Sequence, residues 1–398
     1  MPDLPTLYHG LVLAVLLWGL FTVLANLACF GGLTSAAAPL QDAPRVSILI
    51  PARNEELSIG PCVRSLLAQD YPAWELIVLD DQSSDATPQL LDELGVQSGT
   101  RRARRISGKA LPPGWVGKNW ACHQLAQAAT GDFLFFTDAD TTHAPGTVSA
   151  AVAYAQRHQA SLVSAWPRLI TQSWGEKLII PMIVLAGMTM YPHWLLLWLQ
   201  ARPSRLGHLP EKWRRMLGAA NGQFMFWRRS AYNAVGGHDA IRDHLVEDVA
   251  LGRAVAGRTG EGLRLFNCEA LRFSSCRMYR NFGEVWEGFT KNTWPAFEGR
   301  HAMFVFFGTM HAAAYLLPFV HVFTHRGRPS YPLVIAELAI IVLIRLLLTV
   351  RFRTSWLSVA LHPVAELLAL SIGLNSWRLA GRKGVTWKGR RYVTGSAK

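Results

Sequence analysis

Two aspartates, Asp138 and Asp140, follow the apolar run at residues 133–136 with one residue between them. On an extended backbone, side chains at positions i and i+2 point to the same side, so both carboxylates can reach one ion. Carboxylate oxygens are the ligands that Mg²⁺ and similar hard cations prefer, and such ions commonly also hold phosphate. The spacing therefore predicts a divalent-cation site, although an Asp after a strand can also serve as a turn or helix cap.

A second acidic pair, Asp80 and Asp81, ends another apolar run at residues 75–79. Open α/β sheets bind their ligands at the carboxyl ends of the strands, which is where both acidic pairs would lie. Each pair alone is as typical of a loop cap as of a binding site. Together they favour a site for a metal-bound nucleotide diphosphate.

The elements that must position these carboxylates alternate between strand and helix patterns. Short apolar runs predict strands, and longer periodic segments predict helices, the first of which Ser58 could cap. The strands are expected at residues 46–50, 74–79, 132–137 and 161–165, and the helices at 57–69, 88–94, 119–129 and 145–158. This alternation predicts an α/β fold with a parallel sheet covered on both faces. No G-x-G-x-x-G motif follows any of these strands, which argues against a dinucleotide-dependent dehydrogenase.

Four uncharged or nearly uncharged blocks predict membrane segments at the two ends of the chain. The protein has 398 residues, of which 50% are hydrophobic, and residues 11–33 include no charge. Similar blocks occupy residues 302–324, 331–350 and 356–377, each long enough to cross a bilayer. We therefore expect four parts: an N-terminal signal-anchor (1–40), a globular domain (41–300), a membrane region (301–380) and a basic tail (381–398).

The distribution of charge predicts which side of the membrane the globular domain occupies. Lys and Arg begin after the first apolar block, so the positive-inside rule places the domain in the cytoplasm. The tail is also basic and is therefore expected in the cytoplasm, but three full spans after a cytoplasmic domain would put it outside. One C-terminal block must then re-enter or lie in the interface, and we expect this of 302–324. The net charge is +13, and many of the basic residues lie beside apolar blocks such as 178–199. That block could itself be a span, but we expect it to lie on the membrane surface. This pattern favours an anionic bilayer over nucleic acid.

The cysteines indicate a reducing compartment. The chain has five of them and no C-x-x-C pair, so we expect neither a disulfide nor a zinc framework.

Four motifs in a fixed order resemble the family 2 glycosyltransferases: Pro51-Ala-Arg-Asn-Glu55, Asp80-Asp-Gln-Ser-Ser-Asp85, Asp138-Ala-Asp140 and Val246-Glu-Asp248. The resemblance covers residues 44–295 and implies a GT-A fold, a Rossmann-like nucleotide-sugar-binding domain. Two further segments, 111–121 and 385–392, are similar to the hopanoid-associated glycosyltransferases. They also resemble related enzymes that glycosylate carotenoid acids.

The resemblance implies a role for each acidic motif. Asp140, assisted by Asp138, would bind Mg²⁺ or Mn²⁺ across the two phosphates of a nucleotide sugar. Glu55 and Asp81 would contact the base and ribose. The implied nucleotide-sugar site comprises Pro51, Asn54, Glu55, Asp80, Asp81, Lys118 and Asp138.

Asp248 is the expected general base, with Glu247 as a supporting residue. The base would take the proton from an acceptor hydroxyl as that oxygen attacks C1 from the face opposite the diphosphate, which inverts the anomeric centre. Both residues lie at a predicted helix start, where an acidic pair is also favoured by the helix dipole alone. Glu247 is the alternative base.

Other residues complete the expected site. Lys118 precedes a helical pattern, where a cation and backbone N–H groups could meet phosphate; a solvated surface lysine is the alternative. The segment Asn221-Gly222-Gln223 would line the acceptor or sugar pocket, or form part of a buried strand with Gly at a bend. The Gln-x-x-Arg-Trp motif of many processive family members is missing. The cation that stabilises the leaving group is therefore expected to be Arg280 or Lys291, and a surface role is the alternative for each.

Three hypotheses follow from these observations. The favoured one is a membrane-bound, metal-dependent, inverting hexosyltransferase of the bacterial inner membrane. It would move one sugar from a nucleotide-diphosphate sugar, by family default a UDP-sugar, to a lipid such as a hopanoid or related terpenoid. The second is the same chemistry on a polyprenyl phosphate, sphingoid lipid or polysaccharide. The third is a non-enzymatic membrane protein, which the intact acidic set disfavours.

Overall fold

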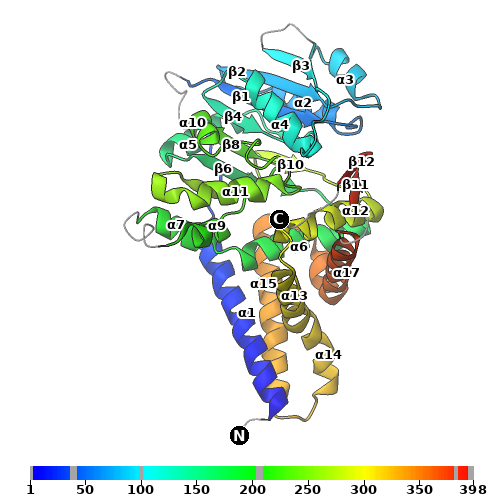
Figure 1. Ribbon diagram of the computed structural model, residues 1–398. Coiled ribbons are helices and arrows are strands. Elements are labelled where there is room, and N and C mark those ends of the chain that lie inside the picture. The colour runs from blue at the N-terminus through cyan, green and yellow to red at the C-terminus, as the bar shows by residue number, and fades with distance from the viewer. Residues whose placement is uncertain (1–2, 36–42, 98–101, 203–208, 381–383, 393–398) are drawn as a thin grey trace. The chain divides into compact units, whose positions relative to one another are not determined.

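The computed structural model describes residues 3–35, 43–97, 102–202, 209–380 and 384–392 (Figure 1). The chain divides into two compact units. A sheet unit is formed by Cys29–Ile170 and His193–Met278, and a helical unit by Met1–Ala28, Thr171–Pro192 and Tyr279–Lys398. All the acidic motifs predicted above lie in the sheet unit.

A seven-stranded sheet with the order β3-β2-β1-β4-β8-β6-β9 forms the centre of the sheet unit. Its strands are β1 (Val46–Ala52), β2 (Trp74–Asp80), β3 (Ala103–Ser107), β4 (Phe133–Phe136), β6 (Leu162–Trp166), β8 (Met225–Arg228) and β9 (Leu265–Glu269). Strand β1 pairs in parallel with β2 and β4, so the loops after these three strands emerge at one edge. Strand β8 runs antiparallel to β4 and β6. The sheet is therefore mixed, and the prediction of a parallel sheet was wrong for β8.

Helices cover both faces of this sheet, as Figure 1 shows. The helices of the unit are α2 (Ile59–Leu67), α3 (Thr87–Glu93), α4 (Gly117–Ala128), α5 (Thr147–Arg157), α7 (His193–Gln200), α9 (Glu211–Met216), α10 (Arg229–Ala234) and α11 (Glu247–Gly257). On one face, Ile48 and Ile50 of β1 pack in a cluster with residues of α2 and α5. On the other, Leu49 packs in a cluster with residues of α4 and α11. The alternation of Ile48, Leu49 and Ile50 between two cores explains why these strands are continuously apolar.

The sheet unit also contains a small three-stranded sheet, which the chain enters from β4 through the acidic motif at 138–140. It consists of β5 (Thr141–His143), β10 (Ser274–Cys276) and β7 (Arg168–Leu169), in the order β5-β10-β7. Strand β5 begins directly after Asp140. This short strand fixes the direction in which the chain leaves the predicted metal site.

The predicted elements of the sheet unit agree with the structure to within a few residues. The four expected strands correspond to β1, β2, β4 and β6, and the four expected helices to α2, α3, α4 and α5. Ser58 does precede α2, but its side chain makes no capping hydrogen bond, so that expectation was wrong. Strands β3, β8 and β9 were not predicted.

The helical unit contains α1 (Leu4–Cys29), α6 (Trp174–Met190), α12 (Phe282–Thr293), α13 (His301–His311), α14 (Leu317–Thr324), α15 (Tyr331–Phe352), α16 (Trp356–Ala360), α17 (His362–Ala380) and the hairpin strands β11 (Val385–Trp387) and β12 (Arg390–Tyr392). Helix α6 contacts α12, α15, α16 and α17. The segment at 178–199 consists of two helices, α6 and α7, rather than one, and most of α6 is buried. The two helices together have the length and composition of a span with a bend of 44°, so the choice between a span and a surface position stays a prediction.

Three helical segments among the described residues are long and apolar enough to cross a membrane: Leu4–Cys29, His301–Thr324 and Tyr331–Phe352. The block at 302–324, expected to re-enter or lie in the interface, has the length and composition of a span, and its path relative to the membrane stays a prediction. A π-helical turn at Ala312–Leu316 joins α13 to α14. Pro318 then falls in the first turn of α14, where its missing N–H costs no hydrogen bond. The block at 356–377 does not pass the same test.

Candidate active site

The loops after β1 and β2 hold each other in place through short polar contacts. Asn54 has a left-handed backbone (φ 52°), and its side-chain oxygen accepts a hydrogen bond from the Ser84 N–H at 2.8 Å. Asp80 accepts one from the Ser83 N–H at 3.1 Å. The Arg53 guanidinium donates to the Asp81 carbonyl at 2.5 Å. Pro51 is the penultimate residue of β1, so the structure brings the predicted nucleotide-contacting residues of both loops together.

Glu55 and Asp81 occupy different positions in this pair of loops. The N–H of Glu55 donates to Thr87 Oγ1 at 2.8 Å, which ties the β1 loop to the start of α3. Asp81 is buried, and its N–H donates to the Ala52 carbonyl at 2.7 Å. Gly108 packs closely against the backbone of the β2 loop, since a Cβ at this position would lie 3.1 Å from the Asp80 carbonyl oxygen. Their roles in base and ribose recognition stay predictions.

Lys118 links the acidic motif after β4 to the acidic motif at the start of α11. Its Nζ lies 2.6 Å from Asp138 Oδ1 and 2.7 Å from Glu247 Oε1. The side chains of Lys118 and Asp138 keep 34% and 25% of their exposure, whereas Glu247 keeps only 8%. We call Lys118, Asp138, Glu247 and Asp248 the carboxylate–lysine cluster. The residues come from three segments that lie far apart in the sequence.

The cluster shifts the pKa values of its members in a consistent way. Burial raises the pKa of Asp138 to about 6, an effect that Asp140 and Glu247 reinforce and Lys118 opposes. Burial alone would lower the pKa of Lys118, but the carboxylates of Asp138 and Glu247 hold it well above its ordinary value. Lys118 is therefore a permanent cation, and its neighbours carry more acidic groups than it neutralises. Such a site favours a further cation.

Asp248 is held by two backbone donors. The Gly222 N–H donates to Asp248 Oδ2 at 2.8 Å, and the Val249 N–H donates to Oδ1 at 2.8 Å. Burial raises the pKa of Asp248 to about 6, helped by Glu247 and opposed by Lys118. A carboxylate with this pKa is ionised at neutral pH yet basic enough to accept a proton in a reaction.

Gly222 lies against three members of the cluster at once. A Cβ at this position would come within 3.2 Å of Glu247 Oε1, 3.3 Å of Asp248 Oδ2 and 3.4 Å of Lys118 Nζ. The close approach of the backbone is what allows its N–H to reach Asp248. The segment Asn221-Gly222-Gln223 thus leads into strand β8, and it also contacts the predicted catalytic residues.

The start of α4 and the start of α11 are joined by a buried asparagine. Asn119 Nδ2 donates to the carbonyls of Ile241 at 2.8 Å and His244 at 2.9 Å. The Val116 N–H donates to the Arg242 carbonyl at 2.7 Å. These bonds fix the loop before α11 against the helix that carries Lys118. They explain why the 111–121 segment and the Val246-Glu247-Asp248 motif form one site.

Asp140 is oriented from the small sheet. Its Oδ1 accepts a hydrogen bond from Thr141 Oγ1 at 3.2 Å and contacts Cys276 Sγ at 3.3 Å. Gln223 Nε2 lies 3.1 Å from the same sulfur. Gln223 Oε1 is buried and has no hydrogen-bond partner among the described residues. It leaves an oxygen acceptor close to the acidic motif.

The donor set around Asp138 and Asp140 fits a hard divalent cation. The backbone between them is a turn, closed by the Thr141 N–H donating to the Asp138 carbonyl at 3.2 Å, so the expectation of an extended backbone was wrong. Both side chains present only oxygen ligands, the type that Mg²⁺ and Mn²⁺ take. The net acidity of the carboxylate–lysine cluster supports the same ion. Asp138 and Asp140 are the residues that would hold it.

Arg280 and Lys291 belong to the helical unit, whereas every other predicted site residue belongs to the sheet unit. Arg280 lies just before α12, and its N–H donates to Glu284 Oε2 at 2.8 Å. Lys291 lies in the last turn of α12. Their assignment to the leaving group stays a prediction.

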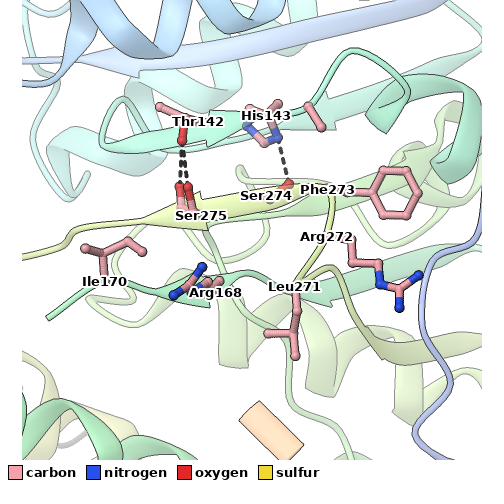
Figure 2. Close-up of a pocket in the computed structure, with 10 residues that line it drawn as sticks. Thr142, His143, Arg168, Ile170, Leu271, Arg272, Phe273, Ser274 and Ser275 are labelled. Atoms are coloured by element: carbon pink, nitrogen blue, oxygen red, sulfur yellow. Dashed lines mark hydrogen bonds between the residues drawn. The ribbon is translucent and has the colours of Figure 1, made fainter. Parts of the chain in front are cut away.

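A pocket of about 300 Å³ opens on the small sheet (Figure 2). Its walls include Arg168, Arg272 and the hydrogen-bonded pairs Thr142–Ser275 and His143–Ser274. None of the predicted site residues lines it. The chemistry of the acidic motifs is therefore centred elsewhere, and this pocket adjoins only the strands that orient Asp140.

Sequence reasoning missed the residues that support the cluster rather than form it. Cys276 and Asn119 are neither charged nor part of a repeated pattern, and each acts through a contact more than 100 positions away. The role of Lys118 was expected to be phosphate binding, yet in this structure it pairs with Asp138 and Glu247. The resemblance of the 111–121 segment pointed to both Lys118 and Asn119, and the predicted helix start pointed to Lys118 as well.

The mixed sheet, the acidic motif after β4 and the acidic start of α11 define a GT-A glycosyltransferase fold. Residues 47–230 match the family model of glycosyl transferase family 2, and residues 214–397 match that of glycosyl transferase family 21. Over residues 47–230 the chain is therefore similar to the family 2 glycosyltransferases.

Two relatives and one solved structure resemble most of the chain. The 4,4'-diaponeurosporenoate glycosyltransferase of Staphylococcus aureus (strain USA300) is 27% identical over 359 residues, which cover 87% of this chain and 88% of the relative. The protein of the same name from strain MRSA252 is 27% identical over 363 residues, with the same coverage. Mannosyltransferase PcManGT from Pyrobaculum calidifontis, solved with GDP-Man and Mn²⁺, superposes with a TM-score of 0.54 at 16% identity and covers 94% of this chain and 99% of that chain. This structural likeness supports the GT-A fold.

Proposed function

We propose that this protein is a membrane-bound, inverting glycosyltransferase that moves one sugar from a nucleotide-diphosphate sugar to a lipid acceptor. The observation that carries the proposal is the carboxylate–lysine cluster, in which Lys118 ties Asp138 of the acidic motif to Glu247 beside Asp248. This arrangement places a candidate cation ligand and a candidate base in one polar site.

In the proposed reaction, the acceptor oxygen attacks C1 of the sugar as the bond from C1 to the diphosphate oxygen breaks. The proton of the acceptor hydroxyl passes to Asp248, and the nucleoside diphosphate leaves with both electrons of the broken bond. Direct displacement inverts the configuration at C1. A divalent cation on Asp138 and Asp140 would neutralise charge on the diphosphate. Gly222 and Val249 keep Asp248 pointed in one direction.

The acceptor is proposed to be a lipid because the helical unit exposes a large apolar surface. Leu4, Phe323 and Val350 keep 79%, 69% and 66% of their exposure, which water would penalise and a bilayer would not. The relatives from Staphylococcus aureus are named for glycosylating 4,4'-diaponeurosporenoate. A hopanoid or related terpenoid is the acceptor class we favour. The positive-inside rule supports a cytoplasmic catalytic domain in the inner membrane of a bacterium.

Label transfer tests this proposal. Membranes that contain the full chain would receive a panel of radiolabelled UDP- and GDP-sugars, Mg²⁺ or Mn²⁺, and a terpenoid-rich lipid extract. We expect label in the organic phase that EDTA abolishes and Mn²⁺ restores, and a product whose anomeric configuration is opposite to that of the donor. Label confined to water-soluble polymer would contradict the lipid acceptor, and no transfer from any donor would contradict the enzyme.

Asp140→Asn provides the matched loss of function. It should lower transfer at least 100-fold, since it removes a charged ligand while keeping its shape. Asp132→Asn is the control, because Asp132 lies just before β4 and its side chain accepts a hydrogen bond from the Arg45 N–H at 2.9 Å. Equal transfer by both variants would show that the reaction does not need the Asp140 carboxylate.

A further inference from the structure

Three histidines meet in the helical unit, at the end where the chain begins. They are His9 of α1, His321 of α14 and His325, which follows α14. One ligand atom from each lies within 4.8 Å of those of the other two. Figure 1 shows that the start of α1 and the connection between α14 and α15 lie at the same end of this unit. We call these residues the histidine cluster.

Two of these rings have a hydrogen bond at Nδ1, and two ring nitrogens of the cluster have no hydrogen-bond partner among the described residues. His9 Nδ1 lies 3.0 and 3.1 Å from the two carboxylate oxygens of Glu337 on α15. His325 Nδ1 lies 3.0 Å from Thr324 Oγ1. His9 Nε2 and His321 Nδ1 are buried and have no hydrogen-bond partner among the described residues. An imidazole that donates from Nδ1 to a carboxylate presents a lone pair at Nε2.

Ring packing alone does not account for this arrangement. The three rings approach edge to face or tilted, with centroids 4.6–5.1 Å apart, a geometry that also occurs in apolar cores. Phe or Leu would pack equally well there without burying nitrogen atoms that lack a partner. His9 is fully buried, and a buried nitrogen without a hydrogen bond destabilises a fold. A metal ion bound by one nitrogen of each ring would give such nitrogens a partner.

We propose that His9, His321 and His325 bind a Zn²⁺ ion, with Glu337 orienting the His9 ring. Neutral imidazoles suit zinc, whereas Mg²⁺ and Ca²⁺ take oxygen ligands. A Zn–N bond of about 2.0–2.1 Å requires nitrogens roughly 3.3 Å apart in a tetrahedral site. The ligand atoms lie within 4.8 Å of one another, and binding of the ion would bring them closer to that value. The carboxylate–histidine–metal arrangement is a recurring feature of zinc sites in proteins.

The site would join helices that are distant in sequence. His9 precedes Cys29, the last residue of α1, by 20 positions, so it lies about 30 Å along the helix from that end. The ion would tie this end of α1 to the α14–α15 connection. Three histidines leave a fourth position for water or another ligand.

Metal content and cobalt spectroscopy test the proposal. The full chain would be purified in detergent with a non-histidine affinity tag, and its zinc measured by mass spectrometry after dialysis against metal-free buffer. We expect about one Zn²⁺ per chain, and visible d–d absorption bands when Co²⁺ is added. His325→Ala and His321→Ala should each lower Zn²⁺ affinity at least tenfold. Glu337→Gln should lower it by about 10–100-fold, since it weakens the His9 ligand without removing it.

His311→Ala is the matched control, because His311 forms a similar pair with Glu366 at 3.1 Å but lies outside the cluster. It should keep the zinc content of the unmodified chain. Should one cluster variant fail to fold, judged by circular dichroism, the other histidine variant and Glu337→Gln still give the answer. Absence of Zn²⁺ and of Co²⁺ bands in the unmodified chain would overturn the proposal. So would equal metal binding in the control and the folded cluster variants.

Discussion

The carboxylate–lysine cluster and the histidine cluster satisfy their buried groups in different ways. In the first, the Lys118 ammonium lies between Asp138 and Glu247, and backbone N–H groups hold Asp248. In the second, a single carboxylate, Glu337, faces one of three imidazoles, and two ring nitrogens have no hydrogen-bond partner among the described residues. The first cluster is largely paired within the protein, whereas the second needs an outside partner.

The different ligand atoms of the two clusters indicate which ion each cluster can bind. Carboxylate oxygens favour Mg²⁺ or Mn²⁺, and imidazole nitrogens favour Zn²⁺. The two clusters belong to separate units of the chain, so a substitution in one should leave metal binding by the other unchanged. Variants in the carboxylate–lysine cluster therefore test whether the two clusters act independently.

The largest effect is expected from Asp248→Asn. Transfer should fall by about 10²–10⁴-fold, because the amide cannot accept the proton of the acceptor. The zinc content of the variant should equal that of the unmodified chain. Asp243→Asn, whose side chain is 74% exposed in the same loop, is the control for activity. A rate near that of the unmodified chain for Asp248→Asn would remove Asp248 as the base and leave Glu247.

The pH dependence of the unmodified enzyme tests the same assignment. A general base must be ionised, and the pKa of Asp248 is raised to about 6. We therefore expect kcat/KM to fall as the pH drops below about 6 and to be level above it. A profile that is flat between pH 5 and 8 would contradict this role.

An intermediate effect is expected from Lys118→Met. Without the ammonium, the pKa of Asp138 should rise further above its value of about 6. A carboxyl with a raised pKa in the folded state gives stability at low pH that is lost as the pH rises through that pKa. The variant should lose about 1–3 kcal/mol of unfolding free energy at pH 8, after allowance for solvent screening, and less at pH 5.

Thermal unfolding in detergent with EDTA measures this difference. Lys109→Met is the control, since Lys109 is exposed and lies outside the cluster. An equal loss of unfolding free energy at both pH values in Lys118→Met would contradict the proposed coupling between Lys118 and Asp138.

The smallest effect is expected from Gly222→Ala. Its Cβ would lie 3.2–3.4 Å from atoms of Glu247, Asp248 and Lys118, all of them ends of side chains that can shift by a few tenths of an ångström. Such a shift in catalytic groups should lower kcat about 3–10-fold. The free energy of unfolding should change by less than about 1 kcal/mol. Gly146→Ala, where a Cβ would meet atoms no closer than 3.8 Å, should be neutral in both measurements.

The strands that carry the acidic motifs could be predicted because each is a short apolar run that ends in aspartate. Strand β8 could not, since its antiparallel direction depends on pairing with β4 and β6, and nothing in its four residues encodes direction. The helical course of residues 301–324 could not be predicted either, because Pro318 reads as a helix breaker. Its effect depends on the π-helical turn just before it.

The sequence by itself determined the ligand types: paired carboxylates after β2 and β4, an acidic start to α11, and apolar helices at both ends of the chain. These features are local, since they depend on residue type and on spacings of a few positions. The tertiary structure decided which groups meet. Lys118 reaches Glu247, Cys276 reaches Asp140, and His9 reaches Glu337 across 328 positions. Such contacts follow from how helices and strands pack, because packing brings together residues whose separation along the chain follows no period.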